Sequence, residues 1–253
     1  NSFKLIGIEG TNKTVLDVYA VPPINLGKRL NYLIHYPYGC VEQTTSSVFP
    51  QLFLNGLLEL PKEQQKEIED NINAGIERLQ KFQVSGGGLS YWPDGYDANA
   101  WGTNYAGHFI LEAKKAGYFV PQHFYDKWLS FQKKRAKLWS SSYAYDKTTQ
   151  AYRLYLLASA NSAELGAMNR LSKIEDLPIV AKWYLATAYY LAGQEEVAKK
   201  MTEGLSKDIP DYQELSYTYG STTRDQAIIL QSLSVMNSKK EAIEIAENIS
   251  NKL

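Results

Sequence analysis

Cysteine is almost absent from this chain, since Cys40 is the only one among 253 residues. A single cysteine cannot form a disulfide within the chain, so a fold stapled by internal disulfides is excluded. Histidine is scarce as well, with His35, His108 and His123 alone, and no Cys-x-x-Cys or His-x-x-x-His spacing indicates a metal site. We therefore expect neither a metal ion nor another cofactor.

An excess of either charge is also absent. Lys and Arg together number 27, as do Asp and Glu, so the formal net charge is zero. This balance gives no electrostatic reason to expect nucleic acid or an anionic membrane surface as a partner. No run approaches the ~20 apolar residues of a membrane-spanning helix, so we expect no membrane insertion by this chain. The remaining composition, 44% hydrophobic and 21% charged, is that of an ordinary globular protein.

The chain opens with neither Met nor a recognisable targeting segment. Residues 3–20 alternate weakly in hydrophobicity around Gly10-Thr-Asn-Lys13, a pattern typical of a β-hairpin, and Pro22-Pro23 ends it. We therefore expect residues 1–22 to be a β-like segment of a preceding domain and residues 23–253 to form a separate helical domain. We also expect the chain to be a piece of a longer protein.

From residue 23 onward, apolar residues recur with a helical period. Beyond a first run near residues 26–34, helices are predicted at 44–60 (with Pro50 near a kink), 63–83, 104–115, 122–134, 148–159, 163–174, 178–191, 195–205, 223–236 and 239–251. About eleven helices in consecutive pairs predict a stacked array of helix hairpins, either an open solenoid or a closed ring. The uneven repeat lengths and the Gly86-rich loop argue against a tetratricopeptide-type solenoid.

The most informative stretch is Tyr36-Pro-Tyr-Gly-Cys-Val-Glu-Gln43, which places a glutamine three residues after the cysteine. Residues i and i+3 share one side of the chain at the start of a helix. The sulfur of Cys40 can then reach the side-chain carbonyl carbon of Gln43, expel ammonia and close an internal thioester. A helix N-terminus would stabilise the thiolate as a leaving group. Such a bond would store an acyl group for transfer to an amine or hydroxyl.

This run resembles the thioester motif of the α2-macroglobulin and complement superfamily, in the form used by its bacterial members. Three further segments are similar to sequences of that family. They are Gly86-Gly-Gly-Leu-Ser-Tyr-Trp92, Trp101-Gly-Thr-Asn-Tyr-Ala-Gly-His-Phe-Ile-Leu-Glu-Ala-Lys-Lys-Ala-Gly-Tyr118 and Tyr219-Gly-Ser-Thr-Thr-Arg-Asp-Gln-Ala227. The resemblance therefore covers almost the whole chain. It implies an all-α fold, an α/α toroid in which a double ring of helix hairpins replaces the open solenoid.

The resemblance also implies a function. The chain would be the thioester domain of a broad-spectrum endopeptidase inhibitor, whose bait segment lies elsewhere in the parent protein. Cleavage of the bait would expose the Cys40–Gln43 bond to a lysine of the protease, which would be trapped covalently. The event is single-use, so the protein would be no enzyme. Its partners would be proteases and other domains of the parent, in the periplasm or cell envelope of a Gram-negative bacterium.

Several neighbours of the motif are candidates for support of the bond. Gly39 relaxes the backbone before the turn. Tyr36 and Tyr38 flank the site, and we expect one of them to cover the bond against water, although ordinary loop packing explains them equally well. Glu42 is expected to point away from the bond and to contact backbone or an outer helix.

In some relatives a histidine attacks the thioester first. By motif order it would fall within residues 138–145, where this chain has none. The absence of this histidine implies that amines attack the thioester directly. Tyr143 and Tyr145, which lie in the same segment, are then candidates for residues near the bond without a defined role. His35 is an alternative acid–base partner of Cys40, whereas His108 is expected to be an inner-helix residue.

Other functions stay open at this point. A toroid interaction module would keep the motif without the bond, since a sequence shows only the potential for a thioester, and Cys40 would then be inert and buried. An α/α-toroid enzyme of the prenyltransferase or terpene-cyclase type needs an acidic metal-binding cluster, to which Asp94 and Asp97 come closest. A cysteine hydrolase needs a histidine base and an orienting Asn or Asp, for which no local signature is present.

Overall fold

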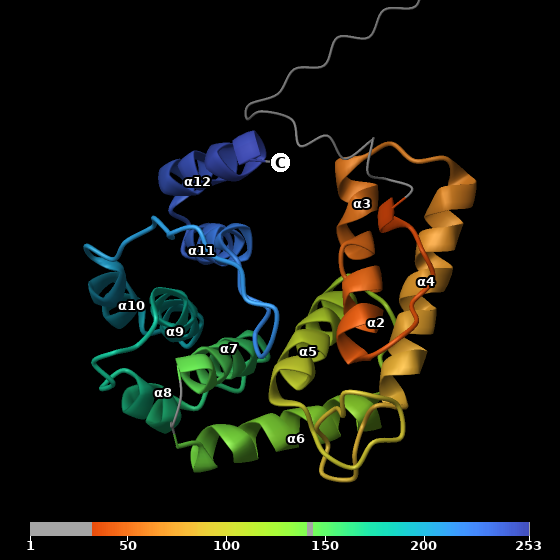
Figure 1. The fold of residues 1–253 in the computed structure, drawn as a ribbon, viewed down its shortest axis with the longest axis horizontal. Coiled ribbons are helices and arrows are strands. Elements are labelled where there is room, and N and C mark those ends of the chain that lie inside the picture. The colour runs from red at the N-terminus through yellow and green to blue at the C-terminus, as the bar shows by residue number, and fades with distance from the viewer. Residues whose placement is uncertain (1–31, 141–143, 253) are drawn as a thin grey trace, which may run out of the picture.

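Eleven α-helices build the part of the chain that the computed structural model describes, residues 32–140 and 144–252 (Figure 1). They are α2 (Val41–Val48), α3 (Gln51–Leu57), α4 (Lys62–Gln80), α5 (Ala100–Lys115), α6 (Gln122–Leu138), α7 (Ala144–Ser159), α8 (Leu165–Leu171), α9 (Ile179–Leu191), α10 (Glu195–Thr202), α11 (Thr222–Val235) and α12 (Lys239–Lys252). Within those residues the only β-structure is three isolated bridges, at Gln83–Leu89, Ser90–Ala98 and Gln213–Ser221. The all-α prediction is confirmed. The β-like segment predicted at residues 1–22 lies outside the described residues, so it and the domain boundary stay predictions.

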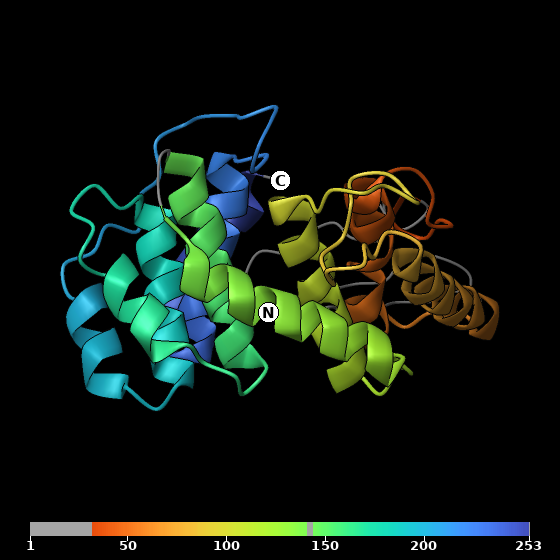
Figure 2. The same ribbon diagram turned by 90° about the horizontal axis from the view of Figure 1, so that it is seen from below.

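The helices alternate between an inner and an outer layer. In Figure 1, α2, α5, α7, α9 and α11 follow one another around the inside, while α4, α6, α8, α10 and α12 pack on their outer side. Figure 2 shows α6 crossing the underside of the molecule and joining its two halves. This double layer confirms the predicted α/α toroid.

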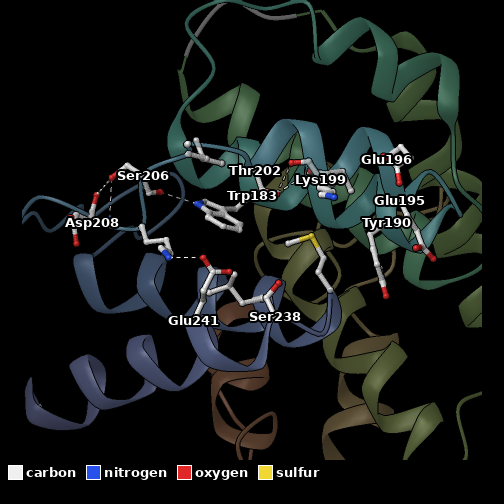
Figure 3. Close-up of a pocket in the computed structure, with 16 residues that line it drawn as sticks. Trp183, Tyr190, Glu195, Glu196, Lys199, Thr202, Ser206, Asp208, Ser238 and Glu241 are labelled. Atoms are coloured by element: carbon white, nitrogen blue, oxygen red, sulfur yellow. Dashed lines mark hydrogen bonds and ion pairs between the residues drawn. The ribbon is translucent and has the colours of Figure 1, made fainter.

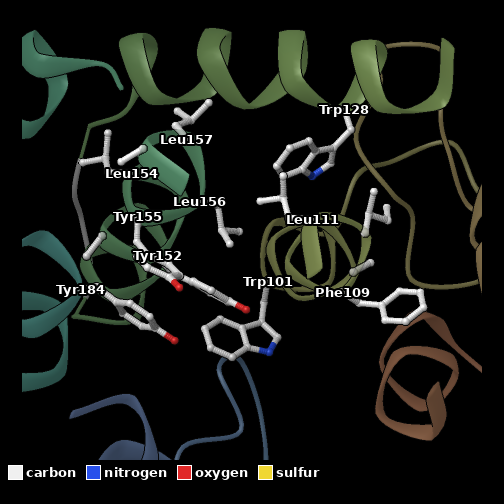
Figure 4. Close-up of a cluster of buried hydrophobic side chains, with 14 of the residues drawn as sticks. Trp101, Phe109, Leu111, Trp128, Tyr152, Leu154, Tyr155, Leu156, Leu157 and Tyr184 are labelled. Carbon is white, nitrogen blue, oxygen red and sulfur yellow. The ribbon is translucent and has the colours of Figure 1, made fainter. Parts of the chain in front are cut away.

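The inner helices owe their place to apolar surface on several faces. Nine of the thirteen residues of α9 are buried, whereas the neighbouring outer helix α10 buries Ala198 alone. Aromatic rings fill the middle of the inner layer, where Tyr152 and Tyr184 stack with their ring centroids 4.8 Å apart (Figure 4). The hydrophobic effect therefore sorts the helices, because only those with little charged surface can be covered on both sides.

The predicted helix boundaries differ from the observed ones by up to four residues, at starts and at ends. The predicted helix 44–60 is divided at Phe49 and Pro50 into α2 and α3. Helix α5 begins four residues before its apolar pattern does, because Asn99 caps it and accepts a hydrogen bond from Gly102 N at 2.6 Å. This early start matters for the site, since it brings Trp101 into the helix.

An inner and an outer helix approach each other closely at Gly107 of α5. A Cβ built there would lie 2.3 Å from the indole of Trp128 on α6. Trp128 is completely buried and donates from Nε1 to the carbonyl of Thr103 at 3.0 Å. The absence of a side chain at Gly107 therefore lets the two layers meet.

Replacing Gly107 by alanine is expected to destabilise the fold by about 1–3 kcal/mol, the usual cost of overpacking a core. A rigid buried indole cannot yield by a rotamer change, so the helices must separate. Unfolding in urea would measure the effect as a lower midpoint. Gly56→Ala in α3 is the matched control, because a Cβ there meets nothing within 4 Å. Equal midpoints for the two variants would contradict this account.

Candidate functional site

The N-terminus of α2 brings together the two residues of the Cys-x-x-Gln motif. Cys40 is the N-cap residue, and Cys40 and Gln43 form a reciprocal capping box. In it the Cys40 side chain faces the backbone N–H of Gln43, while Oε1 of Gln43 accepts from Cys40 N at 3.0 Å. The predicted geometry, with both side chains on one side of a tight turn, is what the structure shows.

Gly39 makes this contact possible. Its φ of +85° lies in the left-handed region that L side chains rarely adopt. A Cβ at this position would lie 2.2 Å from Oε1 and 2.9 Å from Cδ of Gln43. The glycine therefore provides both the backbone turn and the space that the amide of Gln43 occupies.

Two outer contacts hold the turn in place. Arg78 of α4 donates from Nη2 to the carbonyl of Gly39 at 2.9 Å and from Nε to Oγ1 of Thr44 at 3.1 Å. The backbone N–H of Val41 donates to the carbonyl of Tyr91 at 3.0 Å. The start of α2 is thus tied to α4 and to the Gly-rich loop, which fixes Cys40 in position.

Cys40 is buried, whereas Gln43 is exposed to solvent. The hydroxyl of Tyr91 lies 3.5 Å from the hydroxyl of Tyr219, and the Tyr91 side chain also interacts with that of Cys40. Both contacts raise the pKa of Tyr91 well above its ordinary value, so Tyr91 keeps its proton. Two tyrosines from distant parts of the sequence therefore border the thiol.

Glu42 lies beside them in the first turn of α2 and is half-buried. Desolvation raises the pKa of its carboxyl to about 7, and a hydrogen bond from Tyr219 partly opposes that rise. We expected Glu42 to contact backbone or an outer helix. Its partner is instead the loop before α11, because α2 belongs to the inner ring and its first turn faces that loop.

A cavity of about 440 Å³ opens next to the motif. It is lined by Glu42, Gln43, Ser46, Trp101, Tyr105, Thr218, Tyr219 and Arg224. The charge of Arg224 is compensated within its own helix, since Nη2 lies 2.6 Å from Oδ1 of Asp225. Its guanidinium also lies over the ring of Trp101, 5.3 Å from the centroid. Aromatic side chains thus form much of the surface that leads to Gln43.

The other predicted site residues have different surroundings. Tyr36 and Tyr38 are 61% and 67% exposed, and their shielding role stays a prediction. Tyr143 lies outside the described residues. Tyr145 belongs to α7, but its side chain is not described.

The histidines near the site have partners of their own. A ring nitrogen of His35 pairs with the carbonyl of Tyr32 at 2.8 Å. His108 is buried in α5, with Nδ1 2.8 Å from the hydroxyl of Tyr152, which confirms it as an inner-helix residue. Burial lowers the pKa of His108 to about 3, so its ring is neutral at physiological pH.

Sequence reasoning missed Arg78, Tyr91, Trp101 and Tyr219 as site residues. Tyr91, Trp101 and Tyr219 lie in segments that resemble the family, and Trp101 and Tyr219 directly precede a glycine. An aromatic next to a glycine in such a segment was the available signal. Only the folded ring shows that these segments meet at Cys40.

The largest cavities elsewhere carry no comparable chemistry. One of about 760 Å³ lies among α9, α10 and α12, around Trp183, Lys199 and Glu241 (Figure 3). Among the described residues no group of three or more His, Cys, Asp or Glu could hold a metal ion, and no helix there is long and apolar enough to cross a membrane. The motif at α2 is therefore the candidate functional site.

An α/α toroid whose inner ring begins with a paired cysteine and glutamine defines the class of helical thioester domains. The model of the A-macroglobulin TED domain family matches residues 18–148. The chain belongs to this family. It is 28% identical over 237 residues to the alpha-2-macroglobulin of Escherichia coli K12, covering 84% of this chain and 14% of that protein.

Solved structures agree with this membership. The structure of Salmonella alpha-2-macroglobulin reacted with methylamine is 25% identical, with a TM-score of 0.78 over 91% of this chain and 16% of that one. Trypsin-activated alpha-2-macroglobulin from Escherichia coli has the same fold, at 24% identity and a TM-score of 0.75 over 92% of this chain and 17% of that one. The chain thus spans about one-sixth of the length of these relatives.

Proposed function

We propose that this chain carries the covalent trap of a bacterial protease inhibitor, an internal thioester between Cys40 and Gln43. The observation that supports this most is the capping box, which holds the thiol and the amide of these two side chains together at a helix N-terminus. Sulfur attack on Cδ of Gln43 forms the C–S bond, and the amide nitrogen leaves as ammonia. The same site then acylates one nucleophile and is spent.

The electrostatics of the turn favour this acyl chemistry. Negative charge develops on Oε1 of Gln43 whenever a nucleophile adds to Cδ. The N–H of Cys40, 3.0 Å away, is a donor already aimed at that oxygen, and the helix N-terminus adds its partial positive charge. Both lower the barrier to forming the thioester and to opening it.

The acceptor of the acyl group is proposed to be a lysine amine of a protease. The chain lacks a histidine within residues 138–145, so direct aminolysis is the simplest route. The relatives support the partner: the Salmonella protein was reacted with methylamine and the Escherichia coli protein was activated by trypsin. We further propose that the parent protein carries the bait and acts in the periplasm or cell envelope.

The intact mass of the full-length protein containing this chain tests the proposal. We expect a mass lower by one ammonia than the sequence requires and no titratable thiol at Cys40. Methylamine should then add to the protein and release one thiol. A full mass with a free thiol from the start would contradict the trap and leave a toroid that serves only as an interaction module.

A further inference from the structure

We propose that the cavity beside Gln43 admits the attacking lysine side chain and that Glu42 is the base that takes up a proton from its nitrogen. This inference rests on the proposed function, since it concerns the step in which the thioester is opened. It assigns to Glu42 a catalytic role that neither the motif spacing nor the resemblance indicated.

The shape and chemistry of the cavity fit an alkyl amine. Its lining includes the rings of Trp101, Tyr105 and Tyr219, which can pack against the four methylene groups of lysine. Gln43, whose Cδ is the acyl carbon, and Glu42 both line the same cavity. A side chain that enters there brings its nitrogen to the acyl carbon and to a carboxyl group at once.

Glu42 can act as the base because, within the described part of the chain, its carboxylate is not neutralised by a cation. Among the described residues no lysine or arginine forms an ion pair with it. The one cation that lines the cavity, Arg224, is bound to Asp225 and to the carbonyl of Thr218. A half-buried carboxylate without a cation attracts an incoming ammonium and retains affinity for its proton.

Every proton in this step has a donor and an acceptor among the residues present and the solvent. The lysine ammonium first loses one proton to solvent, and the free nitrogen then attacks Cδ of Gln43. The C–N bond forms, the C–S bond breaks, and the electron pair of the C–S bond leaves on Cys40 as a thiolate. The second nitrogen proton passes to Glu42, so an amide, a carboxylic acid and a thiolate result.

Tyr219 and Tyr91 connect Glu42 to the leaving sulfur. Tyr219 lines the same cavity as Glu42, its hydroxyl lies 3.5 Å from the hydroxyl of Tyr91, and the interaction of Tyr91 with Cys40 raises the pKa of Tyr91. A shift of one proton along each of these contacts moves the proton of Glu42 to Cys40. The carboxylate is regenerated and the sulfur ends as a thiol.

The test is the rate at which methylamine releases the thiol from the full-length protein. The rate is measured at a series of pH values around 7 and divided by the concentration of unprotonated methylamine at each pH. The wild-type rate should rise with pH through about 7, because the carboxyl of Glu42 must lose its proton to act as a base. Glu42→Gln should slow the reaction about 10²-fold, the low end for general acid–base catalysis, and abolish that rise. Other titratable or charged side chains around this end of α2 are Arg78, Tyr91, Tyr105, Tyr219 and Arg224.

Controls separate this inference from the proposed function. Glu63→Gln, at an exposed position in the first turn of α4, should leave rate and pH profile unchanged. Tyr219→Phe should slow thiol release, while Tyr96→Phe, at a residue that is 95% exposed, should not. If the wild-type protein releases thiol and Glu42→Gln does so with the same rate and pH profile, the role of Glu42 is refuted but the trap stands. If the wild-type protein contains no thioester, the proposed function itself fails.

Discussion

Replacing Cys40 by alanine is expected to abolish covalent capture of a protease completely. Without the sulfur there is neither a nucleophile to close the thioester nor a leaving group to be displaced. The fold should survive, because loss of an N-cap side chain costs about 1 kcal/mol against a typical total of about 5–15 kcal/mol. The measurement is the amount of adduct that persists in denaturing gels after trypsin is added to the full-length protein.

Gln43→Glu provides a sharper form of the same test. The new carboxylate has the shape of the amide, can still accept from Cys40 N and suits the helix N-terminus. It has no ammonia to expel, and an ionised carboxylate is a poor electrophile, so no thioester should form. A free thiol, full mass and no protease adduct are expected. Covalent adducts in either variant would refute the proposed mechanism.

The chemistry at the start of α2 could be predicted from sequence because it depends on local geometry. Four consecutive residues suffice to place Cys40 and Gln43 together, and the glycine before them marks the turn. The surroundings could not be predicted in this way. Tyr91 and Tyr219 are 128 positions apart, and their 3.5 Å contact exists only because the inner ring brings α2 and the loop before α11 together.

In the fold, too, local features could be predicted from the sequence and long-range features could not. The helical period predicted α4 to α12 one for one and in order, since burial on one face is a property of each segment by itself, but it merged α2 and α3 into one helix. Boundaries were less accurate: α5, for example, begins early because the capping residue Asn99 precedes the apolar pattern. The choice of a ring over an open solenoid came from family resemblance alone, because periodicity does not determine whether the last hairpin returns to the first.

Gly39→Ala is expected to prevent the thioester from forming while leaving the toroid folded. The new methyl group would lie where the side-chain amide of Gln43 now sits, 2.2 Å from its oxygen. Since the backbone cannot move without breaking the bonds from Arg78, the Gln43 side chain must swing away from the sulfur. Intact mass and thiol titration should show a full-mass protein with one free thiol.

Backbone strain alone must be separated from this collision, because a non-glycine residue in the left-handed region costs roughly 1–2 kcal/mol. Gly117→Ala makes that distinction: its φ is +91°, yet a Cβ there meets nothing within 4 Å. Both variants should lose similar stability in urea, but only Gly39→Ala should lack the thioester. If Gly39→Ala retained a blocked thiol that methylamine releases, Cys40 and Gln43 would not need the side-chain arrangement seen here. The capping box would then be a feature of the unreacted turn rather than the geometry from which the bond is made.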